Sequence, residues 1–171
     1  MSNKLTISNH IIDWHGASGY SVWFIITATV LVALGFSTTG WSITEGAQAV
    51  GDRSVGLWQV CNCKLHTDLE DWFKAVQIII SAGLGCLLLS LFCGLHYMLV
   101  HFLSKRFILL VFMFFIVSGV TLLTAGLAMY GYNSEDLHYS FGLVAAGILV
   151  GGIAFLLVLY QLRTAEKCCL Y

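Results

Sequence analysis

Four long windows without a charged residue constrain this chain more than any other feature of its sequence. No Asp, Glu, Lys or Arg occurs in residues 14–44, 75–104, 107–134 or 137–162. Each window exceeds the roughly 20 residues that a helix needs to cross a hydrocarbon core about 30 Å thick. In lipid the backbone must satisfy its own hydrogen bonds, so runs this long and apolar are helical. The sequence therefore predicts an all-α membrane protein with four transmembrane helices.

These helices are expected to form one antiparallel bundle, in a single domain that spans all 171 residues. The expected bounds are about residues 20–38, 75–102, 107–130 and 139–162, with outer loops at 40–74 and 131–139 and a tail at 163–171. Charged residues make up 10% of the chain, against about 25% in soluble domains, which excludes the soluble class. The first apolar run follows a polar head and lacks a small-x-small cleavage site after a short core, so we expect a retained signal anchor.

The distribution of the charged residues predicts the orientation of the bundle. The side that would hold both termini and the turn at residues 105–106 has five basic and two acidic residues, a net charge of +3. The opposite side has three basic and seven acidic residues, a net charge of −4. By the positive-inside rule, both termini are cytoplasmic and the loops at 40–74 and 131–139 face outward. We expect a multi-pass membrane protein.

The first outer loop has room for short strands but not for an independent domain. Aromatic and β-branched residues favour strands at residues 41–44 and 55–60. Farther along, Thr67 and Glu70 are spaced as in a capping box, with Thr67 as the N-cap. A helix is therefore expected to begin at Thr67 and to continue into the second span.

Small residues four apart predict where helices approach one another closely. Gly147 and Gly151 form one such pair in the fourth span, and Ser90 and Gly94 form a similar pair in the second. Packing within the bundle is the favoured interpretation, with a dimer face as the alternative.

Cys61 and Cys63 lie in the outward loop, where disulfides persist. Three interpretations are open: an intrachain disulfide, a redox-active pair and half of a metal site. Zinc would need further close ligands, and His66 is the single one nearby. The disulfide is favoured, and we expect no metal.

The other four cysteines fall into two pairs. Cys86 and Cys93 lie seven residues apart on one face of the second span and are expected to be inert packing residues. Cys168 and Cys169 follow the fourth span on the cytoplasmic side, where reversible palmitoylation is one expectation.

His96 is the titratable residue that lies well inside a span, and such residues are functional candidates by default. A neutral imidazole hydrogen-bonded to a neighbouring helix is the commoner case. His101 and His138 lie at other depths, so no haem-binding pair is expected. No Ser-His-Asp set or carboxylate pair lies at membrane depth, and we expect no catalytic residue and no cofactor.

The polar loop carries a pattern that resembles the W-GLW-C-C signature of the claudin superfamily, which includes claudins and the peripheral myelin protein and epithelial membrane protein group. The residues of the pattern are Trp41, Gly56, Leu57, Trp58, Cys61 and Cys63. Residues 71–77 and 139–142 look particularly like the myelin and epithelial members. The topology agrees with the superfamily along nearly the whole chain.

This resemblance implies a small extracellular antiparallel β-sheet in the first outer loop. Trp41, Leu57 and Trp58 would anchor the sheet to the bundle, and Cys61 and Cys63 would form its disulfide. In claudins several residues that form a hairpin separate the two cysteines, whereas here a single residue, Asn62, does. The tail also ends in Leu-Tyr, not in the usual claudin Tyr-Val.

The resemblance further implies a non-enzymatic protein of the plasma membrane, located at cell–cell junctions. It would contribute to adhesion and a paracellular barrier through cis and trans association of its outer loops. Its partners would be membrane lipid and either further copies of itself or other junction proteins, with no nucleic acid. An auxiliary subunit of a channel or receptor is the alternative, and a membrane thiol oxidoreductase that uses Cys61 and Cys63 is a third hypothesis.

Overall fold

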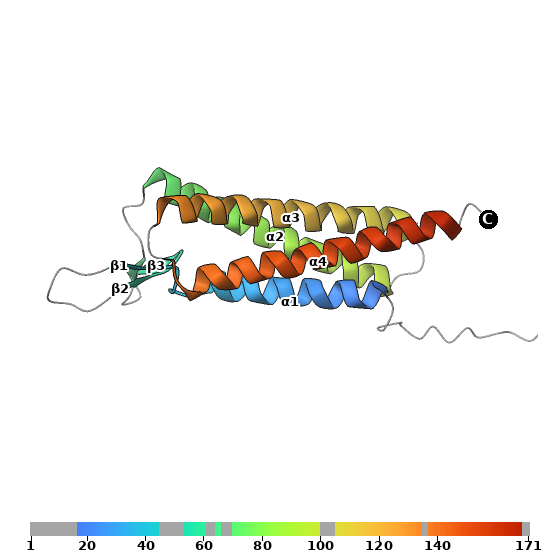
Figure 1. Ribbon diagram of the computed structural model, residues 1–171, viewed down its shortest axis with the longest axis horizontal. Helices are drawn as coiled ribbons and strands as arrows, with labels where there is room; N and C mark the ends of the chain where they lie inside the picture. The colour runs from blue at the N-terminus through green and yellow to red at the C-terminus, as the bar shows by residue number, and fades with distance from the viewer. Residues whose placement is uncertain are drawn as a thin grey trace, which may run out of the picture.

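A computed structural model describes residues 17–44, 53–60, 64–65, 70–99, 105–134 and 137–168. Its helices are α1 (Ala17–Ser37), α2 (Asp71–Leu99), α3 (Lys105–Asn133) and α4 (Tyr139–Cys168). All four are long and apolar enough to cross a membrane. They lie side by side in one elongated bundle (Figure 1). The prediction of four helices of this kind is confirmed.

Most helix ends lie beyond the predicted spans. The second helix begins at Asp71, ahead of the predicted span at residue 75 but after the expected helix start at Thr67, and the fourth continues to Cys168, not to residue 162. The third begins at Lys105 and ends at Asn133, past both predicted limits. A window without charges marks the part of a helix suited to lipid, whereas the i→i−4 hydrogen bonds continue into the polar region at each side. The spans were therefore predicted shorter than the helices.

The helices associate as two extensive pairs, α2 with α3 and α1 with α4. Glycines permit the close approach in each pair because they carry no Cβ. A Cβ on Gly83 would lie 2.8 Å from the Leu123 side chain of α3. A Cβ on Gly147 would lie 2.6 Å from the Val32 side chain of α1. Backbone contact through small residues is thus part of both pairs.

The two predicted small-residue pairs lie in the interior of the bundle. Gly147 packs on α1, and a Cβ on Gly151 would lie 3.0 Å from the side chain of Val120 in α3. Ser90 and Gly94 are buried as well. The structure therefore places all four residues at contacts within one chain.

A four-stranded antiparallel sheet lies beyond one end of the bundle. Its strands are β1 (Ser42–Thr44), β2 (Arg53–Val55), β3 (Gln59–Val60) and β4 (Lys64–Leu65), hydrogen-bonded in the order β1-β2-β3-β4. The sheet adjoins the end of the bundle where α1 ends and α4 begins, and the last turn of α4 lies at the opposite end (Figure 1). That the sheet faces outward from a cell stays a prediction.

The predicted strand at 55–60 is wrong. In the structure β2 ends at Val55 and β3 begins at Gln59, and the two strands pair through Val55 and Val60. The three residues between them turn the chain and bring the side chain of Leu57 into the protein, where it is fully buried. A continuous strand would have left no such turn.

The predicted start of the second helix also needs correction. The backbone N–H groups of Phe73 and Lys74 donate to the carbonyl oxygen of Glu70 at 3.0 and 3.2 Å. Glu70 therefore directly precedes the first helical turn, and its carboxylate accepts a hydrogen bond from the indole of Trp72. The proposed N-cap, Thr67, lies outside the described residues. The helix begins later than the capping-box spacing suggested because Glu70 occupies the N-cap position rather than the third helical position.

Candidate functional site: the anchor of the sheet on the bundle

Trp41 is the centre of the contact between the sheet and the helices. Its side chain has no solvent exposure, although it immediately precedes β1. The indole Nε1 donates a hydrogen bond of 2.8 Å to the carbonyl oxygen of Gly35. The last four carbonyl groups of a helix have no intrahelical partner, and Gly35 lies in the last turn of α1. Trp41 thus satisfies its own buried donor and helps to satisfy the end of a helix.

Tyr130 of α3 holds the opposite side of the Trp41 ring. The two rings meet edge to face, with centroids 4.9 Å apart, and Tyr130 is itself almost completely buried. Its hydroxyl donates to Oγ of Ser42 in β1 at 3.1 Å. An edge-to-face aromatic pair contributes about 0.5–1.5 kcal/mol beyond the area that it buries. Helix α3 is thereby tied to the first strand.

Leu57 is the second buried contact of the sheet. Its side chain packs in the same apolar cluster as Trp41 and Tyr130. The side-chain amide of Gln77 in α2 donates to the Leu57 carbonyl oxygen at 2.7 Å. The turn that separates β2 from β3 is therefore held both by apolar packing and by a hydrogen bond.

Trp58 contacts the bundle at its margin. It is partly buried, and its ring meets the ring of Phe36 in α1 edge to face at 5.4 Å. Its Nε1 is buried and has no hydrogen-bond partner among the residues that the structure describes. The two signature tryptophans thus differ in hydrogen bonding: the indole N–H of Trp41 has an acceptor, and that of Trp58 has none among the described residues.

The start of α4 completes the attachment through its backbone. The N–H of His138 donates to the Trp41 carbonyl oxygen at 3.0 Å, and the N–H of Ser140 donates to the Gly40 carbonyl oxygen at 2.8 Å. The hydroxyls of Thr38 and Ser140 lie 2.7 Å apart, within hydrogen-bonding distance. We call Trp41, Leu57, Gln77, Tyr130 and Ser140 the sheet anchor. Its members come from the loop and from three helices, α2, α3 and α4.

Sequence reasoning singled out Trp41 and Leu57 but missed Gln77 and Tyr130. A glutamine in the first turns of a spanning helix and a tyrosine near the end of another are ordinary interfacial residues. A polar amide inside an otherwise apolar window was the available signal for Gln77. Nothing local to Tyr130 points to a partner 88 positions away.

Several predicted site residues have no described position in the structure. Cys61, Cys63 and Cys169 lie outside the described residues, and the side chain of Cys168 does as well, although its backbone ends α4. The disulfide, the redox pair and the palmitoylation sites therefore stay predictions. Gly56, also part of the signature, is buried.

His96 and the two cysteines of α2 lie away from the sheet anchor. The His96 ring is 6.3 Å from that of Phe92, and the imidazole makes no hydrogen bond to any residue in the described ranges. The expected hydrogen bond to a neighbouring helix is thus not found there. Cys86 and Cys93 are free thiols and partly buried. Within the described part of the chain, no three His, Cys, Asp or Glu residues are grouped to hold a metal ion.

No protein-family model and no curated protein sequence matches this chain. The geometry around Trp41 therefore carries the functional argument. It fixes a small sheet to a helical bundle.

Proposed function

We propose that this chain is a claudin-like, non-enzymatic protein of the plasma membrane that acts at cell–cell contacts. It would present its sheet outward for cis association with neighbours and trans association with the facing cell. The sheet anchor is the observation that carries this proposal. A sheet held by Trp41, Leu57 and Ser140 keeps a fixed orientation relative to the helices.

A fixed orientation favours association because ordering a loop at the moment of binding reduces affinity. The sheet anchor orders the loop before any partner binds. It does so through buried aromatic rings and through hydrogen bonds from the helices to the sheet. Full burial of one aromatic side chain stabilises a fold by about 4–6 kcal/mol at 25 cal/mol per Å². Trp41 is buried to that extent. The sheet is therefore suited to act as a preformed contact surface.

The charges support the outward direction of the sheet. The end of the bundle that carries the sheet has the acidic excess, and Glu70 and Asp71 are exposed there at the start of α2. The opposite end carries Arg106 and Arg163. Under the positive-inside rule the sheet is extracellular and both termini are cytoplasmic.

The proposal is tested by mixing cells that express a tagged copy with cells that do not. Trans association predicts enrichment of the tag where two expressing cells meet, and no enrichment where an expressing cell meets a non-expressing one. In an epithelial layer, loss of the protein should lower electrical resistance and increase the flux of an uncharged tracer. Uniform surface staining together with unchanged resistance would reject the proposal.

One observation favours an auxiliary subunit of a channel or receptor as a second candidate. Val60 of β3 pairs directly with Lys64 of β4, so residues 61–63 alone connect these two strands. A connection this short extends the sheet little beyond its two strands, and a compact sheet suits lateral contact within one membrane. Purification in a gentle detergent distinguishes the candidates: a stoichiometric channel partner with altered gating supports the subunit, and recovery without any partner rejects it.

A further inference from the structure

A hollow of about 210 Å³ lies between α2 and α3, at the end of the bundle opposite the sheet. Figure 1 shows α2 diverging from α3 toward this end. Gly94 is buried beside the hollow, and a Cβ there would lie 3.1 Å from both Val22 of α1 and Phe112 of α3. At this level α2 therefore contacts α1 and α3 closely, and the hollow lies beside that contact.

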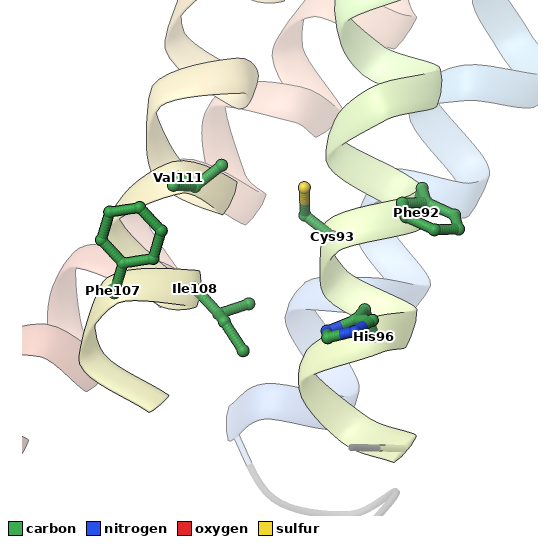
Figure 2. A pocket seen from close by; sticks show the side chains of 6 residues that line it. All are labelled: Phe92, Cys93, His96, Phe107, Ile108 and Val111. Atoms are coloured by element: carbon green, nitrogen blue, oxygen red, sulfur yellow. The ribbon is translucent and has the colours of Figure 1, made fainter. Parts of the chain in front are cut away.

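The lining of the hollow is apolar except at one position. The lining residues are Phe92, Cys93, His96, Phe107, Ile108 and Val111. Figure 2 shows Cys93 of α2 and Ile108 and Val111 of α3 directed toward the space between the helices, with His96 one turn closer to the end of α2. The hollow is thus lined almost entirely by apolar atoms, with the His96 imidazole on the side nearer the end of α2.

The surroundings of the hollow restrict its occupant. Phe92 and Phe107 at its rim are 68% and 64% exposed, and both belong to helices long and apolar enough to span a membrane. In a bilayer the medium at such a surface is acyl chain. A partner helix, about 10 Å in diameter, is too thick for a space of this volume. A single acyl chain is thin enough to enter it.

The charges beside the hollow select the kind of lipid. Lys105 and Arg106 immediately precede Phe107 and begin α3, whose N-terminus carries the positive end of the helix dipole. At 1.5 Å per residue, His96 lies within about 5 Å of the end of α2 along its axis, at a similar depth. Helix α4 adds Arg163, which is exposed, at this end of the bundle. These charges complement an anionic headgroup.

We propose that the hollow binds one acyl chain of an anionic phospholipid. The chain lies against Cys93, Ile108 and Val111, and the phosphate headgroup is held beside His96 and Arg106. This site rests on the four membrane-spanning helices and not on the proposed role at cell contacts. The protein would therefore carry a bound lipid on the face of the bundle farthest from its sheet.

Photocrosslinking of the full-length protein in phosphatidylcholine nanodiscs tests the site. The probe is phosphatidylserine with a diazirine at the middle of one acyl chain, and mass spectrometry locates the adducts. We expect adducts concentrated on residues 92–96 and 107–111. Adducts spread equally over other lipid-facing residues, such as Leu149 of α4, would overturn the proposal.

A matched pair of substitutions on α3 separates occupancy of the hollow from general lipid contact. Val111→Phe fills the space and should reduce labelling by about tenfold, the ratio that corresponds to 1.4 kcal/mol. Val117→Phe, at a position 42% exposed and outside the hollow, should leave labelling unchanged. Equal labelling of the two variants would refute the site. Cys93→Leu fills the same space from α2 and decides the question if Val111→Phe does not fold.

The headgroup is tested by competition. Unlabelled phosphatidylserine should displace the probe, whereas further phosphatidylcholine or a sterol should not. Arg106→Gln should reduce labelling about fivefold, the ratio for about 1 kcal/mol per basic residue near an anionic surface. Equal displacement by phosphatidylcholine, or no effect of Arg106→Gln, would overturn the anionic headgroup.

Discussion

The indole of Trp41 and the carbonyl of Gly35 are joined by a hydrogen bond of 2.8 Å in a position closed to solvent. The bond connects the residue that begins the sheet to the last turn of the first helix. Because it lies in the interior, neither atom can exchange its partner for water. This contact is therefore one of the buried attachments that hold the sheet relative to the bundle.

Replacement of Trp41 by phenylalanine should destabilise the fold by about 1–3 kcal/mol, because the buried Gly35 carbonyl loses the indole donor and keeps only the longer hydrogen bond of 3.4 Å from the Thr38 hydroxyl among the bonds described. Circular dichroism of the protein in detergent should show a lower Tm. Fluorescence of a probe on the sheet should show earlier loosening of the sheet than of the helices. An unchanged Tm would show that the hydrogen bond contributes little.

The same substitution at Trp58 should behave differently. Its Nε1 is buried without a partner among the described residues, so Trp58→Phe removes an unsatisfied donor while it keeps an aromatic ring against Phe36. The lost side-chain volume lowers the stability of the fold, whereas removal of the unsatisfied donor raises it. We expect the unfolding free energy to change by less than about 1 kcal/mol. A loss as large as that of Trp41→Phe would contradict this difference between the two tryptophans.

Gln77→Leu should loosen the turn at Leu57 while it leaves the bundle intact. The substitution keeps a side chain of similar size but removes the donor to the Leu57 carbonyl oxygen. A lost hydrogen bond of about 0.5–1.5 kcal/mol should raise amide hydrogen exchange in residues 57–60 by up to about tenfold. Ile78→Leu is the control, because Ile78 is 69% exposed and lies outside the sheet anchor. Equal exchange in both variants would rule out the role of Gln77.

Substitution of two glycines of α4 by alanine should affect the stability of the fold differently. Gly147→Ala places a methyl group 2.6 Å from Val32 and 3.1 Å from the backbone oxygen of Ala28, so we expect a loss of about 1–3 kcal/mol. Gly152→Ala meets nothing within 4 Å and should be neutral or stabilise the helix by about 0.5–1 kcal/mol. Thermal unfolding of both variants in one detergent compares them. Equal stabilities would contradict the close α1–α4 packing.

Patterns along the chain predicted the helices well because each depends on a local property. Four windows without charge indicate four spans, since the cost of a charge in lipid applies to every residue of the span. The ends of the helices were less predictable. Backbone hydrogen bonding continues past the apolar window, so Asp71 and Cys168 are helical although neither segment around them is uniformly apolar.

The sheet and its anchor were predictable only in part. Residues 55–60 carry a strand-like composition, and the turn inside them exists because Leu57 finds a buried position among helices that lie elsewhere in the chain. Tyr130 pairs with Ser42, and Ser140 with Thr38, across about a hundred residues. Such pairs follow from the arrangement of the whole bundle, and no local pattern specifies them.

The extensive pairing of α1 with α4 has a consequence for biosynthesis. Helix α1 receives its principal partner only after α2, α3 and α4 have been made. The backbone bonds from His138 and Ser140 to the residues before β1 likewise form only after the start of α4 has been made. We therefore expect a chain interrupted before α4 to retain a first helix without its principal partner and a loosely held loop. Quality control in the secretory pathway can recognise both features before the protein reaches the cell surface.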